Sequence, residues 1–205
     1  MEILKKSIVL ALFISAQFVV AQDQKTLQDA FSKSYTLETG LKYNEGVELL
    51  KGLNAVNNYP VQLRLGWLYY LGKRYDESNA AYKKASVIMP ASIEPLNGIT
   101  TILAVQNKWT ELEENYLAIL KIDPKNSQTN FRLGQIYYNK KEFAKAEKYF
   151  NVSLNLYPFD YDAMLMSAWT YYFLGKYGEA KELFNQVLLY KPADASAKDG
   201  LAHIK

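Results

Sequence analysis

Few side chains in this 205-residue sequence have the types and spacing that catalysis requires. The single histidine, His203, stands near the C-terminal end, where we expect it to be exposed to solvent. Glu111, Glu113 and Glu114 form a carboxylate run, which at a helix start favours the helix dipole and faces solvent. The sequence has no Gly-rich phosphate loop, nucleophile elbow or metal-ligand cluster, and it lacks cysteine. It therefore predicts no catalytic residue, no cofactor and no bound metal.

Repeated aromatic residues are the stronger candidates for a binding site. The stretch GWLYYLGKRYDES begins at Gly66, and AWTYYFLGKYGEA begins at Ala168. Trp67, Tyr69, Tyr70 and Tyr75 return 102 residues later as Trp169, Tyr171, Tyr172 and Tyr177, and 102 is three times 34. Aromatic side chains bury a large area with little loss of rotamer freedom, which suits the binding of proteins or peptides.

Proline residues mark the same period. Pro90, Pro124, Pro158 and Pro192 are 34 residues apart, and each is followed two residues later by Ser92, Asn126, Asp160 or Asp194. Proline ends a helix because it cannot donate an amide hydrogen, and Ser, Asn or Asp can accept from the first amides of the next helix. Between these marks, apolar residues recur at offsets of three and four, as in the stretches 127–140 and 142–157. The sequence predicts pairs of amphipathic helices joined by short turns.

This pattern resembles the tetratricopeptide repeat, a helical hairpin of about 34 residues. The small eighth position holds Gly66, Gly134 and Ala168, and the bulky twenty-fourth holds Leu50, Tyr82, Tyr116, Phe150 and Phe184. The resemblance covers about residues 27–192. It implies an all-α, right-handed superhelical solenoid of about five hairpins, at 27–58, 59–92, 93–126, 127–160 and 161–194. Residues 195–205 would form a capping helix over the open end. In the third repeat, Gly98 fits the small position only if two residues are inserted before Trp109.

The resemblance also implies a concave groove, lined by the first helix of each hairpin. The matching positions hold Phe31, Tyr35, Leu63, Trp67, Tyr70, Pro95, Ile99, Ile102, Phe131, Gln135, Tyr138, Leu165, Trp169 and Tyr172. Tyr69 and Tyr171 are expected in the hairpin core. Arg64 and Arg132 flank the groove, where they could hold a ligand carboxylate or pair with a neighbouring Asp or Glu. The aromatic residues could equally fill space between adjacent helices.

The first 21 residues form a separate object. A basic start, MEILKK, precedes an apolar run over residues 8–21, which is shorter than the roughly 20 apolar residues of a membrane span. We expect a secretory signal cleaved after Ala21, leaving a single repeat domain over residues 22–205 without stable membrane insertion. The mature chain would carry 22 basic and 20 acidic residues, a balance that does not favour nucleic acid as a partner.

These features predict an exported, periplasmic scaffold that is not an enzyme and that binds a protein or an extended peptide. The alternative is a self-assembling structural or accessory subunit of an envelope complex, with the same aromatic residues as an interface in a homo-oligomer.

Overall fold

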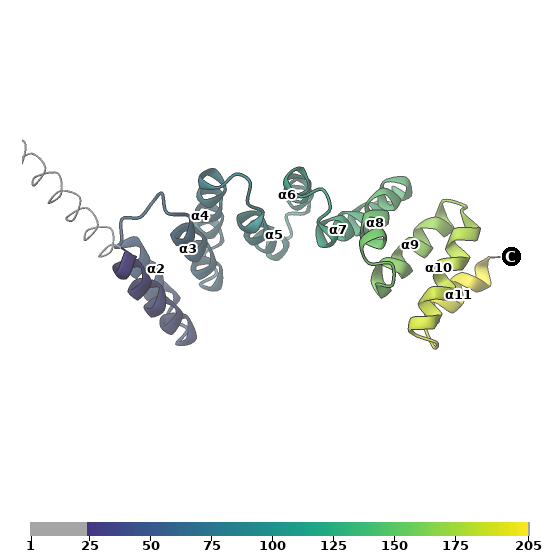
Figure 1. Cartoon of the computed structure of the whole chain (residues 1–205), viewed down its shortest axis with the longest axis horizontal. Helices are drawn as coiled ribbons and strands as arrows, with labels where there is room; N and C mark the ends of the chain where they lie inside the picture. Colours follow the sequence, from purple (N-terminus) through teal and green to yellow (C-terminus); the bar gives the residue numbers. More distant parts are fainter. Residues whose placement is uncertain (1–23, 205) are drawn as a thin grey trace, which may run out of the picture. The chain divides into compact units, whose positions relative to one another are not determined.

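The computed structural model describes residues 24–204, and every regular element in this range is a helix (Figure 1). Residues 24–39 are helical, and the elements that follow are α2 (Tyr43–Lys51), α3 (Tyr59–Leu71), α4 (Tyr75–Ile88), α5 (Glu94–Val105), α6 (Trp109–Ile122), α7 (Ser127–Asn139), α8 (Phe143–Leu156), α9 (Tyr161–Phe173), α10 (Tyr177–Tyr190) and α11 (Ala195–His203). The all-α class is confirmed, with two helices in each expected repeat and α11 last. The expected signal at residues 1–21 lies outside the described residues. No helix in the described range is long and apolar enough to cross a membrane.

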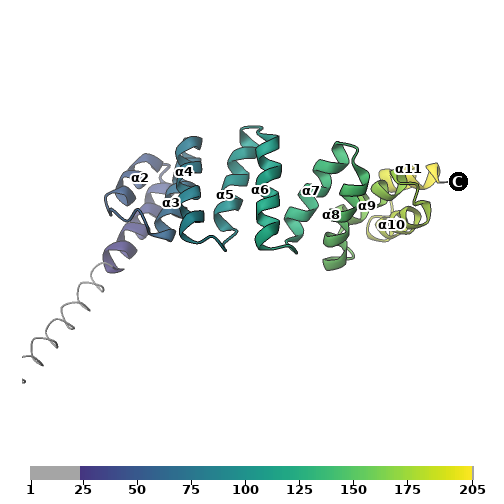
Figure 2. The ribbon, with the colours of Figure 1, turned by 90° about the horizontal axis from the view of Figure 1, so that it is seen from above.

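The chain divides into two compact parts, an N-terminal part that ends at Ile102 and a C-terminal part that begins at Leu103. In the N-terminal part, helix 24–39, α2, α3 and α4 enclose a core in which Leu50 and Leu68 are fully buried. Figure 2 shows α3 and α4 as an antiparallel pair. Leu65 and Leu68 of α3 belong to this core, and other residues of α3 lie near residues of helix 24–39 and α5 outside it.

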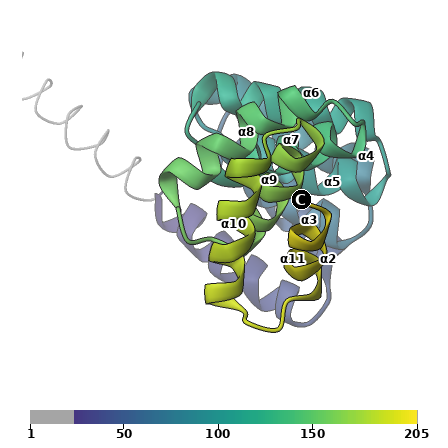
Figure 3. The same cartoon turned by 90° about the vertical axis from the view of Figure 1, so that its right-hand side faces the viewer.

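The C-terminal part contains the pairs α7–α8 and α9–α10, followed by α11. Phe150 of α8 and Phe184 of α10 are fully buried at the centres of two clusters. Helix α11 packs against α9 and α10 (Figure 3), and a Cβ atom added at Gly200 would lie 2.2 Å from the Phe184 ring. The predicted capping role of residues 195–205 is therefore confirmed for the described part of this segment.

Helix starts follow the predicted capping residues at three of four positions. The side chains of Asn126, Asp160 and Asp194 accept from the backbone amides three residues ahead, at 3.0, 2.9 and 2.9 Å. Ser92 differs, because its hydroxyl accepts from the amide of Glu94, two residues ahead, at 3.3 Å. Asn58 caps α3 in the same way as the three, although no proline precedes it by two residues.

Small residues allow close helix approach where the sequence predicts it. Added Cβ atoms would lie 2.7 Å from Tyr82 at Gly66 and 2.5 Å from Phe150 at Gly134, so both glycines face the ring of the paired helix. The contacts of Gly98 show that the predicted two-residue insertion in the third repeat is wrong. Gly98 faces Tyr82 of the preceding hairpin, with an added Cβ at 2.4 Å, just as Gly200 faces Phe184. Gly98 therefore occupies the sixth position of its repeat, and no two-residue insertion is needed.

Candidate functional site

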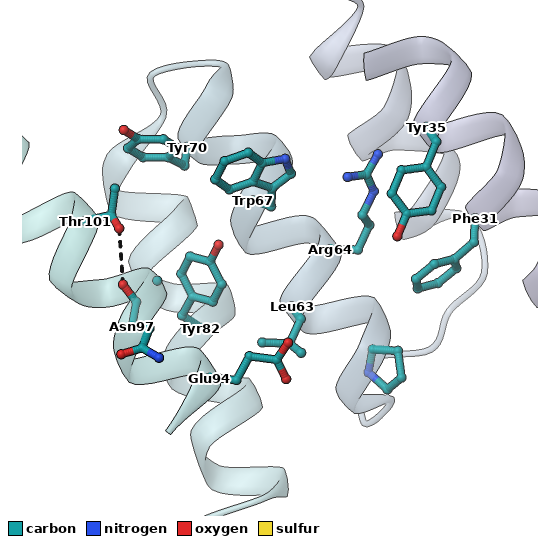
Figure 4. A pocket seen from close by; sticks show the side chains of 12 residues that line it. Phe31, Tyr35, Leu63, Arg64, Trp67, Tyr70, Tyr82, Glu94, Asn97 and Thr101 are labelled. Atoms are coloured by element: carbon teal, nitrogen blue, oxygen red, sulfur yellow. Dashed lines mark hydrogen bonds between the residues drawn. The ribbon is translucent and has the colours of Figure 1, made fainter. Parts of the chain in front are cut away.

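The N-terminal part contains a cavity of about 550 Å³ (Figure 4). All six groove residues predicted in the first two repeats line it: Phe31, Tyr35, Leu63, Arg64, Trp67 and Tyr70. Helix 24–39 supplies the first two of these residues, and α3 supplies the other four. The structure thus brings these six side chains together, while their role in binding stays a prediction.

The opposite wall comes from α5, and here the predicted residues were wrong. Pro95, Ile99 and Ile102 are buried, whereas Glu94, Asn97 and Thr101 line the cavity. Those three occupy positions two, five and nine when the third repeat starts at residue 93 without an insertion. The unbroken 34-residue spacing of the prolines was the signal that could have found them.

Aromatic rings form most of the apolar surface of the cavity. Trp67 and Tyr70 stack with ring centroids 5.6 Å apart, and Trp67 remains 39% exposed. Tyr82 of α4, which lies between Gly66 and Gly98, also lines the cavity. Burial raises the pKa of Tyr82 to about 12, helped by the negative charge of Glu94, so its hydroxyl stays protonated at neutral pH. These rings offer flat apolar faces beside a polar α5 wall.

Arg64 pairs within the chain. Its side chain is 6% exposed, it forms an ion pair with Glu38, and its Nε donates to the Ser34 hydroxyl at 3.0 Å. Its guanidinium also lies 3.9 Å from the centroid of the Tyr35 ring. Of the two roles considered for Arg64, the structure shows pairing with a carboxylate of the same chain.

Glu38 joins this pair to the aromatic wall, because its Oε1 accepts from the Trp67 indole at 3.0 Å. Partial burial by itself would raise the pKa of Glu38, but the hydrogen bonds from Trp67 and Arg64 and the charge of Arg64 together lower it. Glu38 is therefore ionised at neutral pH, and it fixes the orientation of the Trp67 ring.

The groove residues predicted on α9 contact α10 and α11 of the same chain. Trp169 donates from its indole to the Ser196 hydroxyl of α11 at 2.8 Å, and its ring meets Phe184 at 5.1 Å. Tyr172 faces the ring of His203, and Leu165 packs against the core beneath. For Trp169, filling space between helices is the role that the structure shows.

The remaining predicted residues lie on α7. Phe131 contacts Phe150 and lines a smaller cavity of about 240 Å³ together with Arg132, Asp160 and Asp162. Arg132 is exposed and donates to the Gln135 side chain at 3.0 Å. Tyr138 belongs to a different group of rings, with Phe143 and Phe173. This cavity is less than half the volume of the one in the N-terminal part.

The carboxylate run and the histidine singled out in the sequence make contacts within the chain. No group of three or more His, Cys, Asp or Glu side chains in that range could hold a metal ion. His203 is half exposed, and its Nδ1 lies 2.8 Å from the Asp199 carbonyl oxygen, as expected for a residue near the end of a surface helix. Glu113 departs from expectation, because it pairs with Lys140, which directly follows α7, and is largely buried rather than solvated.

Comparison with known proteins identifies the repeat. Three segments match models of the tetratricopeptide repeat, at residues 61–86, 127–160 and 161–194. A tetratricopeptide repeat protein 21 homolog of Caenorhabditis briggsae is 26% identical over 118 residues, which are 58% of this chain but only 9% of that protein.

Solved structures of such proteins share the fold. A tetratricopeptide repeat protein from Parabacteroides merdae aligns with a TM-score of 0.67 at 20% identity, over 88% of this chain and 72% of that one. YrrB, described as having an unusual peptide-binding site, aligns at 0.62 and 13% identity, over 84% and 90%. MamA from Desulfovibrio magneticus aligns at 0.62 and 13% identity, over 83% and 97%. At these identities the likeness concerns the fold.

Proposed function

Because this chain is a tetratricopeptide repeat protein, a family that is typically non-catalytic, we propose that it is a scaffold that binds a protein or an extended peptide. The proposed site is the cavity of the N-terminal part. One observation carries the proposal: positions two, five and nine of successive repeats converge on that cavity, with exposed aromatic faces. Its volume of about 550 Å³ lies within the range of small-ligand and side-chain pockets.

Affinity capture from the native host tests this proposal with two tryptophan variants. Trp67→Ala removes an aromatic face of the cavity, whereas Trp109→Ala removes a 60% exposed tryptophan that does not line it. We expect Trp67→Ala to lose partners that the wild type and Trp109→Ala retain. Circular dichroism must show that both variants are folded. Retention of the same partners by all three proteins would contradict the proposal.

The proposal extends to location: the chain is exported, to the periplasm in a Gram-negative host. The support is the sequence of residues 1–21, with its basic start, short apolar run and Ala21 at the expected cleavage point. N-terminal sequencing of the protein from its native host is the test. A mature chain that begins at Gln22 would agree with export, and a chain that retains residues 1–21 would argue against cleavage.

A second candidate function is self-assembly as a structural or accessory subunit. It is favoured by exposed rings in the C-terminal part, where Phe159 and Tyr190 are 55% and 57% exposed and their centroids lie 5.6 Å apart. Apolar patches of this kind mark interaction surfaces. Light scattering over a range of concentrations would detect an oligomer. Self-assembly predicts that Phe159→Ser combined with Tyr190→Ser dissociates it, while Trp67→Ala does not.

A further inference from the structure

The charges around the cavity of the N-terminal part do not balance. Among the residues that line it, Arg64 and Glu94 carry charge, and Glu38 forms an ion pair with Arg64. Arg64 and Glu38 neutralise each other, and Arg64 is buried beneath Tyr35. The Arg64 Nη2 atom has no hydrogen-bond acceptor, but it is also closed to solvent, so an incoming carboxylate cannot reach it without displacing its neighbours. Glu94 is therefore the charge that a ligand would meet.

Glu94 lies at the start of α5, exposed to solvent, with its side chain beside Leu63 (Figure 4). Its Oε2 accepts from the Tyr59 hydroxyl at 3.0 Å, and that hydroxyl also contacts the Ser92 hydroxyl at 2.8 Å. In the described part of the chain, no lysine or arginine forms an ion pair with this carboxylate. The cavity thus combines an unneutralised carboxylate with several aromatic faces.

That combination has a definite preference among peptide side chains. The negative face of an aromatic ring attracts a cation, most strongly on tryptophan, and a carboxylate nearby adds to the attraction. The long aliphatic part of lysine or arginine can pack on apolar surface, here Leu63 and Pro60, while the charged end reaches a polar group. An acidic side chain would instead face the Glu94 charge without compensation.

We propose that this cavity selects peptide segments that carry a lysine or arginine side chain, held between the Trp67 and Tyr70 rings and the Glu94 carboxylate. This inference rests on the proposed function and reverses the charge preference that Arg64 suggests in the sequence. Asn97 and Thr101, on the same wall of the cavity, supply further hydrogen-bonding groups for the peptide.

Selection from a random library of 12-residue peptides tests the inference. We expect peptides bound by the wild type to be enriched in Lys and Arg and depleted in Asp and Glu. For the strongest of them, calorimetric titration should show about threefold to fivefold weaker binding to Glu94→Gln, the scale of one exposed charge pair. Trp67→Ala should weaken binding about tenfold or more. Replacing the basic residue of the peptide with norleucine should abolish the effect of Glu94→Gln.

A matched control keeps the test specific. Glu45→Gln changes the net charge by the same amount at an exposed residue of α2 that does not line the cavity, and it should leave binding unchanged. Peptides that bind through Trp67 with no basic preference, or with an acidic one, would overturn this inference but leave the proposed function standing. Equal effects of Glu94→Gln and Glu45→Gln would also overturn it. If no peptide binds, this inference fails, whereas the proposed function fails only if affinity capture also finds no partner that depends on Trp67.

Discussion

Glu38 contacts two residues of α3 that have different roles in the cavity: it forms an ion pair with Arg64 and accepts from the Trp67 indole. Arg64 is buried and paired, whereas Trp67 keeps an open face, and the same carboxylate holds both. The two residues lie three positions apart on one helix and differ in exposure, with Arg64 at 6% and Trp67 at 39%. The stability of the N-terminal part should therefore depend on Arg64 more than on an exposed arginine.

We predict that Arg64→Ala lowers the free energy of unfolding by about 2 kcal/mol, because it leaves Glu38 partly desolvated without its cation and removes the contact with Tyr35. Arg132→Ala is the control, because Arg132 is exposed and its change should stay within about 0.5 kcal/mol. Urea unfolding followed by circular dichroism gives both values. Equal losses for the two variants would contradict the role assigned to Arg64.

Asp194 predicts a pH dependence of stability. The hydrogen bond from the Tyr161 hydroxyl, at 2.6 Å, does most to lower its pKa, and the Ala197 amide and Lys191 lower it further against the effect of burial. Because the folded-state pKa lies below the ordinary 3.8, the contribution of this carboxylate is complete above pH 3.8 and is lost as pH falls through the folded-state value.

Asp194→Ala should therefore lower the stability at pH 7 by about 1 kcal/mol, the usual value of a helix cap. The difference in stability between the wild type and Asp194→Ala should become smaller as the pH falls below 3.8. Thermal unfolding at a series of pH values measures it, with Asp199→Ala, an exposed residue of α11, as the control. A gap of constant size at all pH values would exclude an ionised Asp194 as its cause.

The sequence predicted the cavity residues of α3 but not those of α5. The cavity residues of α3 followed from their position in the repeat, since exposure along a helix is set by spacing. Those of α5 were missed because glycine permits two different close approaches. Gly66 faces its own hairpin, whereas Gly98 faces the preceding one, and the residue type alone does not distinguish them. The sequence also did not identify the ion-pair partner of Arg64, because Glu38 lies 26 residues earlier in the chain.

At the scale of helices, packing against an aromatic ring makes glycine necessary at Gly134. We predict that Gly134→Ala destabilises the protein by about 1–3 kcal/mol, because its Cβ would lie 2.5 Å from a fully buried Phe150 that has little room to move. Gly178→Ala is the matched control. Gly178 also lies in a helix, no atom lies within 4 Å of its added Cβ, and alanine there should stabilise by up to about 1 kcal/mol. In urea unfolding, we expect the free energy of unfolding to fall for Gly134→Ala and to rise for Gly178→Ala.

The hairpin turns show a regularity that sequence reasoning did not capture. Lys73, Asn107, Lys141 and Gly175 are 34 residues apart, and all have positive φ, between 56° and 73°. Only the last is a glycine, so the residue types did not reveal a shared left-handed turn. The residue types also did not reveal the ion pairs between neighbouring hairpins. Lys140 and Lys176 reach Glu113 and Glu147 from different positions of their repeats, and a lysine in such a run is most often solvated.

At the scale of the whole chain, repeat proteins must cover the apolar face of the last hairpin. The sequence predicted this cover from the incomplete sixth repeat, and α11 provides it. The sequence did not show which predicted groove residues α11 would contact. Trp169 repeats Trp67 in sequence, yet it donates to Ser196 of α11, whereas Trp67 lines the cavity. Equivalent residues thus differ because α11 follows one of them and a complete repeat follows the other.

A chain that ends at Ala193 tests this difference. The truncation would uncover the Phe184 ring, which is fully buried, and remove the hydrogen-bond partner of Trp169. We expect the free energy of unfolding to fall by about 3 kcal/mol, because the Phe184 and Trp169 rings become exposed to solvent. The uncovered face should also associate with copies of itself, which light scattering would detect as a mass that rises with concentration. Lys198→Ala, an exposed change on α11, should affect neither property. If the shortened chain stayed monomeric and equally stable, α11 would not be the cover that its contacts with α9 and α10 indicate.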